Sequence, residues 1–142
     1  MQIHAVTEAE MANAQVVREF IESMGKVPAE ERYGRAFAAD SRVWWESLPG
    51  SETQWLEDTY YQGPAAAAAA ASEYVSAGVI YNTSIHEIFA CGPVVVTRRT
   101  DTPVEIAMGH DQAVHMSGVF TLREGKIVLW MDYIGHKTGM AG

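Results

Sequence analysis

The stretch VVVTRRTD, residues 94–101, starts with three valines and ends with two arginines, a threonine and an acid. Side chains alternate between the two faces of a strand, so Arg99 and Asp101 are expected on one face of a sheet. The same period of two extends along the chain in both directions from this stretch. It predicts four strands, at about residues 79–90, 93–104, 109–122 and 126–135.

The N-terminal half has the periodicity of helices instead. Apolar residues recur every three or four positions after a threonine that can cap a helix, and a proline before alanines or glutamates suits a first helical turn. A run of seven alanines has the highest helix propensity. Three helices are expected, from Thr7 to Gly25, from Pro28 to about Ala39, and from Pro64 through the alanines of residues 65–71.

Between the second and third helices, the segment SRVWWESL (41–48) reads as a strand and residues 49–63 as a long loop. Loops of this length often act as lids. Helices first and antiparallel strands afterwards describe an α+β domain, with the N-terminal helices packed against one face of a curved sheet. We expect a single domain over residues 1–142, because no internal repeat or linker interrupts the pattern.

Length, charge and cysteine content exclude several classes of protein. A chain of 142 residues, 48% of them hydrophobic, can build one core and little more. A formal net charge of −8 repels phosphate backbones, so no nucleic acid partner is expected. Cys91, the single cysteine, allows no intramolecular disulfide and favours a reducing compartment. With no long apolar run and no signal-peptide features, we expect a cytoplasmic protein without a membrane partner.

A second acid is expected close to Arg99 and Asp101. In KIVLWMDYIG (126–135), strict alternation would place Asp132 on one face with Val128, Trp130 and Ile134, and Ile127 on the other face with Leu129, Met131 and Tyr133. A buried carboxylate is costly unless it is paired, and Arg99 on a neighbouring strand can pair with it. One cation would then hold two acids, whose pKa values should move apart, so that one donates a proton while the other accepts one.

With these motifs the sequence resembles the limonene-1,2-epoxide hydrolase family of the cone-shaped NTF2-like fold, which also includes SnoaL-type cyclases and ketosteroid-isomerase relatives. The resemblance lies in SIHEIFACGPVVVTRRTD, with its Arg-x-Asp motif, and in GVFTLREGKIVLWMDYIG, with its Trp-x-Asp-Tyr motif. It implies a curved mixed or antiparallel sheet packed against N-terminal helices, and a homodimer formed through the open face of the sheet.

The resemblance also implies a reaction, the one-step hydrolysis of a small or medium apolar epoxide to a vicinal diol, without metal or cofactor. In the family, the aspartate of the Arg-x-Asp motif protonates the epoxide oxygen and the aspartate of the Trp-x-Asp motif activates water. By this resemblance Asp101 is the general acid, Asp132 the general base, and Arg99 the group that orients both.

One part of the family pattern is missing. The family holds the attacking water with a Tyr-x-Asn pair on the strand after the second helix, where this chain has Trp44-Trp45-Glu46. An indole N–H can only donate a hydrogen bond, whereas Glu46 can accept one from water. We expect Trp44, Glu46 and Trp130 to contact the water or the substrate. A third carboxylate near Asp132 would leave one of these acids protonated.

Other interpretations stay open. Arg99 and Asp101 alone could form a solvated pair on an exposed strand, and the aromatic residues could be core or dimer surface. His110 and His115 have opposite parity and no HExxH motif is present, so no metal site is expected. The remaining alternatives are a cyclase or isomerase of the same fold, which opens an epoxide with an internal hydroxyl, and a non-catalytic protein that binds a hydrophobic ligand.

Overall fold

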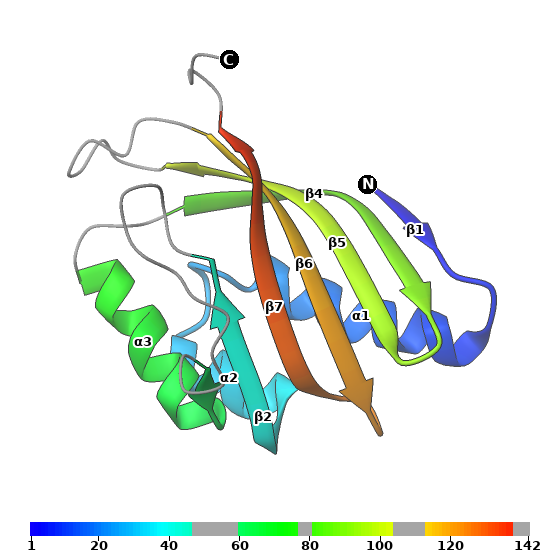
Figure 1. Cartoon of the computed structure of the whole chain (residues 1–142), viewed down its shortest axis with the longest axis horizontal. Helices are drawn as coiled ribbons and strands as arrows, with labels where there is room; N and C mark the ends of the chain where they lie inside the picture. Colours follow the sequence, from blue (N-terminus) through cyan, green and yellow to red (C-terminus); the bar gives the residue numbers. More distant parts are fainter. Residues whose placement is uncertain (47–59, 77–80, 104–112, 138–142) are drawn as a thin grey trace.

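Figure 1 shows the computed structural model, which describes residues 1–46, 60–76, 81–103 and 113–137. In this part of the chain, seven strands form one sheet in the order β1-β4-β5-β6-β7-β2-β3. The elements along the chain are β1 (Gln2–His4), α1 (Glu8–Glu22), α2 (Ala29–Ala36), β2 (Phe37–Trp45), β3 (Tyr61–Gln62), α3 (Pro64–Ser76), β4 (Tyr81–Cys91), β5 (Val94–Pro103), β6 (Val114–Arg123) and β7 (Lys126–Lys137).

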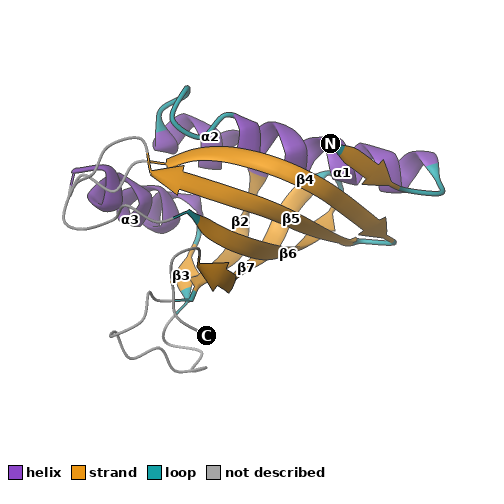
Figure 2. Cartoon of the chain, turned by 90° about the horizontal axis from the view of Figure 1, so that it is seen from above, coloured by secondary structure: helices purple, strands orange, loops and turns teal. Residues whose placement is uncertain are grey.

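The sheet is mixed. Strands β4 to β7 pair antiparallel in sequence order, whereas β1 pairs parallel with β4 and β2 pairs parallel with β7. Figure 2 shows α1 and α2 along one side of the curved sheet, with α3 beside them at one end. The hydrophobic core lies between these helices and the sheet. We call this side of the sheet the helix-covered face. The expected α+β architecture is confirmed.

The first helix begins where the sequence predicts. Thr7 Oγ1 accepts a hydrogen bond from the Glu10 N–H at 3.1 Å, and Glu10 Oε1 accepts one from the Thr7 N–H at 2.9 Å. This reciprocal capping box satisfies two backbone donors that a helix start otherwise leaves free. The helix ends at Glu22, before the predicted Gly25. None of the described helices is long and apolar enough to cross a membrane.

The boundary between the second helix and the following strand differs from the prediction. Helix α2 ends at Ala36 and β2 begins at Phe37, so the helix and the strand are both present but the predicted bounds, a helix to about Ala39 and a strand from Ser41, were wrong. The Phe37 backbone is extended, and its ring packs against Phe20 and Trp130 with centroid separations of 4.9 and 6.3 Å. This packing, together with pairing to β7, outweighs the helix propensity of the alanines.

Two short strands were not predicted. Strand β1 has three residues and β3 has two, which is too short to show a period. Strand β3 lies in the predicted loop of residues 49–63, and residues 47–59 of that segment lie outside the described residues. The four predicted strands of the C-terminal half correspond to β4 to β7, and α3 starts at Pro64 as expected.

A bulge in β7 changes which side chains share a face. The register with β6 passes from Leu122–Ile127 to Thr121–Leu129, so Val128 is the extra residue. Ile127 is therefore buried in the same core cluster as Trp130. The prediction that these two residues face opposite sides was wrong, because one extra residue shifts the alternation of a strand by one position.

Candidate active site

Arg99 lies between two aspartates on the helix-covered face. Its Nη1 and Nη2 atoms donate to the two carboxylate oxygens of Asp132 at 2.7 and 2.6 Å, and its Nε and Nη2 atoms donate to those of Asp101 at 3.1 and 3.2 Å. The side chains of Arg99, Asp101 and Asp132 are 3%, 12% and 6% exposed. The planar guanidinium thus fixes both carboxylates in a dry environment. We call these three residues the acidic triad.

The triad spans three strands rather than two neighbours. Strand β6 separates β5, which carries Arg99, from β7, which carries Asp132, so the expectation of a directly neighbouring strand was wrong. Two strand spacings amount to about 9–10 Å. Gly118 on β6 pairs in register with both Thr97 and Asp132. A Cβ atom at residue 118 would lie 3.1 Å from Asp132 Oδ1 and 2.8 Å from Thr97 Oγ1, so the absence of a side chain leaves room for the ion pair.

The charges of the triad do not balance, because one cation faces two acids. Burial raises the pKa of Asp132 above its ordinary value, and Arg99 opposes this shift without cancelling it. Burial disfavours the charge of Arg99 as well, but the two carboxylates outweigh this effect and raise its pKa. The guanidinium therefore stays charged, and the pair of acids is suited to holding one proton. An acid that carries the proton and an acid that lacks it can act as donor and acceptor in one reaction.

Thr83, which sequence reasoning missed, makes a further contact to this triad. It pairs with Asp101 across β4 and β5, and its Oγ1 donates to Asp101 Oδ1 at 2.9 Å. Counting back from the Cys91–Val94 pair at the turn would place Ser84 opposite Asp101 instead. A register shift at His86 moves Thr83 into that position. The bulge has no clear signal in the sequence, which explains why the contact was not predicted.

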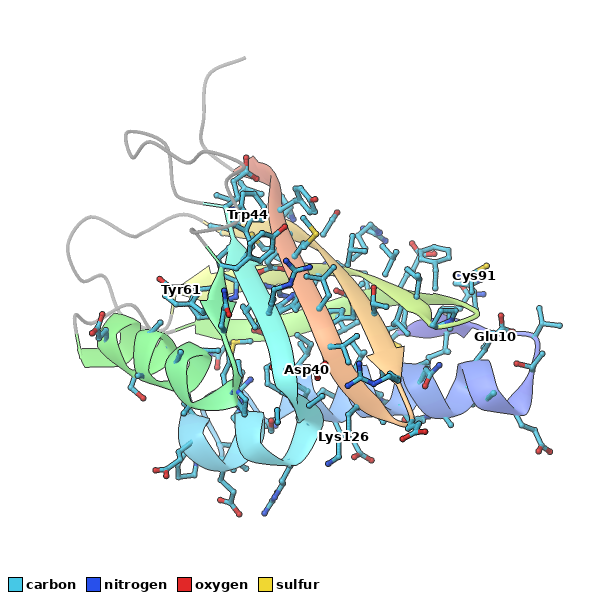
Figure 3. The ribbon with its side chains drawn as sticks, turned by 60° about the horizontal axis from the view of Figure 1, so that its bottom comes forward. Glu10, Asp40, Trp44, Tyr61, Cys91 and Lys126 are labelled. Atoms are coloured by element: carbon cyan, nitrogen blue, oxygen red, sulfur yellow. The ribbon has the colours of Figure 1, made fainter. Side chains whose placement is uncertain are left out.

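The predicted role of Trp44 does not fit its placement. In the parallel register of β2 and β7, Trp44 is opposite Met131, whereas Trp45 is opposite Asp132. Trp44, labelled near the end of β2 in Figure 3, therefore lies on the face opposite the triad, with its ring 5.4 Å from that of Tyr133. At this end of β2, Val43 and Trp45 lie on the helix-covered face, one position away from the Trp44 and Glu46 that the sequence suggested.

Glu46 and Trp130 lie beside Asp132 in different ways. The Glu46 N–H donates to the Asp132 carbonyl oxygen at 2.9 Å, and Glu46 Oε2 accepts from the Ile134 N–H at 2.6 Å. This carboxylate thus accepts a hydrogen bond from the backbone of β7, two residues beyond Asp132. Trp130 is buried, stacked on Phe120 at 5.2 Å between ring centroids. Contact of either residue with water or substrate stays a prediction.

Tyr33 on α2 was not predicted either, since no motif marks it. Its side chain is buried, with its ring 5.1 Å from that of Phe20 and 4.9 Å from that of Phe37. Burial is the main reason why the pKa of Tyr33 is raised; the charge of Arg32 opposes the shift, and Asp132 and Arg99 also act on this hydroxyl, in opposite directions. The phenol therefore lies within the electrostatic field of the triad.

The histidines of the described part of the chain are not grouped with acids or cysteines in a way that could hold a metal ion. His86 and His115 both make hydrogen bonds to the Thr100 hydroxyl, at 2.7 and 2.8 Å. Thr100 lies between Arg99 and Asp101 in β5, so this row is on the opposite face of the sheet from the triad. Both histidines therefore contact Thr100 on that face.

Comparisons with known proteins show the family and the fold of the chain. The sequence profile described as "Limonene-1,2-epoxide hydrolase catalytic domain" matches residues 11–140. A comparison with curated proteins found no matching sequence. Among solved structures, an LEH-like epoxide hydrolase of M. tuberculosis is similar with a TM-score of 0.66 and 21% identity, over 89% of this chain and 84% of that chain.

Two further solved structures show the same fold at lower identity. An NTF2-like protein of unknown function from Mesorhizobium loti has a TM-score of 0.69 and 14% identity, over 96% of this chain and 100% of that chain. A putative SnoaL-like polyketide cyclase from Jannaschia Sp. CCS1 has a TM-score of 0.70 and 15% identity, over 93% of this chain and 91% of that chain. The fold is therefore NTF2-like, and the fold by itself is shared by proteins of different descriptions.

Proposed function

The chain belongs to the limonene-1,2-epoxide hydrolase family, and we propose that it adds water to a small or medium apolar epoxide to give a vicinal diol. The observation that carries this proposal is the buried guanidinium of Arg99 with a carboxylate on each side. An epoxide needs a proton on its oxygen and a nucleophile at its carbon at the same moment. Two acids held by one cation can supply both functions without a cofactor.

In the reacting form of the proposed mechanism, the proton that the two acids share lies on Asp101, and Asp132 is ionised beside Arg99. Asp132 then takes a proton from water while the water oxygen forms a bond to an epoxide carbon. The carbon–oxygen bond of the ring breaks, and the epoxide oxygen takes the proton of Asp101. At the end Asp132 is protonated and Asp101 is ionised, so the net charge of the acidic triad is unchanged. No new charge has to be created in a buried site, which would be costly. One proton then returns from Asp132 to Asp101, directly or through solvent, before the next turnover.

The surroundings of the triad favour an apolar substrate. The ring of Trp130, two residues before Asp132, is the centre of an aromatic cluster on the helix-covered face. Such a cluster makes the neighbourhood of the triad apolar, and sites for apolar ligands combine a lining of this kind with a few polar groups that orient the ligand. The rings of this cluster belong to Phe20, Phe37, Trp45, Phe120 and Trp130.

A different observation supports a second candidate function. Val43 and Trp45 are the β2 residues opposite Trp130 and Asp132, and neither can accept a hydrogen bond from a water molecule. A cyclase or isomerase, in which an internal hydroxyl of the substrate attacks in place of water, would not need such an acceptor. This alternative predicts a product that contains no oxygen from solvent.

The test is turnover of a panel of terpene, styrene and cycloalkene epoxides by the wild type and by Asp101→Asn and Asp132→Asn. General acid–base groups contribute about 10²–10⁴-fold to a rate, so each variant should lose at least about 100-fold. Asp40→Asn is the matched control, because this exposed acid on β2 pairs only with Arg123 among the described residues (Figure 3). Retention of most of the activity in either triad variant would refute the mechanism.

A further inference from the structure

The two oxygens of Asp101 are not equivalent. Oδ1 accepts two hydrogen bonds, from Arg99 Nε at 3.1 Å and from Thr83 Oγ1 at 2.9 Å. Oδ2 accepts one, from Arg99 Nη2 at 3.2 Å. Each carboxylate oxygen has about two acceptor sites, so Oδ1 is filled and Oδ2 has one site left. When Asp101 is protonated, the proton is therefore carried by Oδ2.

We propose that Thr83 is a positioning residue for the general acid: its hydroxyl occupies Asp101 Oδ1, so that the transferable proton is carried by Oδ2. The inference rests on the proposed function, because Asp101 must be the acid for the choice of oxygen to matter. Arg99 alone donates once to each oxygen and leaves the two equivalent in number of bonds. The threonine on the neighbouring strand breaks this symmetry.

The hydroxyl of Thr83 has one hydrogen and two possible acceptors. Besides Asp101, Met24 Sδ lies 3.7 Å from Thr83 Oγ1. A thioether is a weak acceptor, whereas a carboxylate at 2.9 Å forms one of the stronger kinds of hydrogen bond. Met24 packs against the hydrophobic core, so it also shields this hydroxyl from solvent. The hydrogen therefore points to Asp101.

The hydrogen bond from Thr83 to Asp101 should become stronger as the reaction proceeds. Asp101 begins neutral and ends as an anion, and a hydrogen bond to a charged acceptor is stronger than one to a neutral acceptor. The Thr83 hydroxyl thus stabilises the transition state more than the ground state, which raises kcat rather than binding. The gain from such a bond corresponds to roughly 10- to 100-fold in rate.

The experiment compares Thr83→Val, which replaces the hydroxyl with a methyl group of similar size, and Thr83→Ser, which keeps the hydroxyl. The control is Ser84→Ala, since Ser84 is the next residue, is exposed, and points to the other face of the sheet. Thr83→Val should lower kcat by roughly 10- to 100-fold with KM within about threefold of the wild type. Thr83→Ser and Ser84→Ala should stay within about threefold of the wild-type kcat.

The pH profile separates positioning from packing. The acid must be protonated to react, so the rate falls at high pH when the acid ionises. Loss of a donor that favours the anion moves this limb to higher pH in Thr83→Val. A merely structural role would leave the limb in place. An unchanged limb together with an unchanged kcat would overturn the proposal.

A measurement without substrate separates this inference from the proposed function. Urea unfolding of the wild type, Thr83→Val, Asp101→Asn and the double variant forms a double-mutant cycle. If Thr83 holds Asp101, Thr83→Val lowers the unfolding midpoint more in the wild-type background than with Asp101→Asn. Additive effects would overturn the contact whatever the activity. If the effects are not additive but the protein opens no epoxide, the hydrolase function and the catalytic role of Thr83 are refuted. The contact between Thr83 and Asp101 would then still stand.

Discussion

Replacing Arg99 with glutamine should destabilise the protein in a strongly pH-dependent way. The guanidinium is buried and makes four hydrogen bonds to Asp101 and Asp132. Without it, two carboxyl groups share a buried site with no cation. They can remain there only by taking up protons, so the pKa of Asp132, which burial already raises, must rise further.

The magnitude follows from the cost of a broken buried ion pair, which is about 3–5 kcal/mol. Protonation of the acids relieves this cost, so the cost depends on pH. A carboxyl group with a raised pKa in the folded state keeps its stabilising effect below its unfolded value and loses it as the pH rises through the folded value. The difference from the wild type should therefore be small near pH 4 and largest above about pH 7.

The assay is thermal unfolding followed by circular dichroism between pH 4 and pH 8. For a chain of 142 residues, 1 kcal/mol corresponds to about 4 °C, so the Tm of Arg99→Gln should be about 10–20 °C below that of the wild type at pH 8. Arg98→Gln is the matched control, because Arg98 is the preceding residue, its side chain is 59% exposed and it pairs with Glu87. An exposed pair contributes at most about 1 kcal/mol.

Two results would contradict this reasoning. One is an Arg99→Gln protein that unfolds like Arg98→Gln over the whole pH range, which would mean that the acids are not held by Arg99. The other is a loss of stability that is equally large at pH 4. Adding Asp132→Asn to Arg99→Gln should restore part of the lost Tm at pH 8, because one of the two uncompensated acids is then removed.

Three further predictions can be tested, the first two from these contacts and the third from the resemblance to the family. Gly118→Ala should lower activity by at least about tenfold, since the added Cβ displaces Asp132 Oδ1. Gly34→Ala is the control and should keep its activity, because there is open space around Gly34; turnover assays on both variants check this. Asp132→Asn alone should lower the Tm at pH 8, but by less than Arg99→Gln does in the same thermal unfolding assay, because Asp101 still pairs with the guanidinium. Light scattering should give the mass of a homodimer; a monomer at working concentration would contradict that expectation.

The acidic triad could be predicted from the sequence because each step used one strand at a time. Alternation placed Arg99 with Asp101, and the cost of burying Asp132 among apolar neighbours required a cation. The helix cap at Thr7 was equally local, since all its contacts lie within four residues. Local patterns of this kind are visible in a single sequence.

The parts that failed depend on register between distant segments. Which of Trp44 and Trp45 faces the triad is decided by the pairing of β2 with β7, and these strands are separated by about half of the chain. Thr83 lies opposite Asp101 because of a bulge, and Gly118 matters because β6 runs between the strands of the triad. A sequence pattern fixes faces within a strand but not the offset between strands.

The most direct test of the proposed reaction is the origin of the new oxygen. The wild type and Asp132→Asn would be incubated with the epoxide panel in ¹⁸O-labelled water, and the products analysed by mass spectrometry. We predict a diol with one labelled oxygen from the wild type and no diol from Asp132→Asn. An unlabelled isomer or cyclic ether, or a labelled diol formed equally well by Asp132→Asn, would contradict water attack assisted by Asp132.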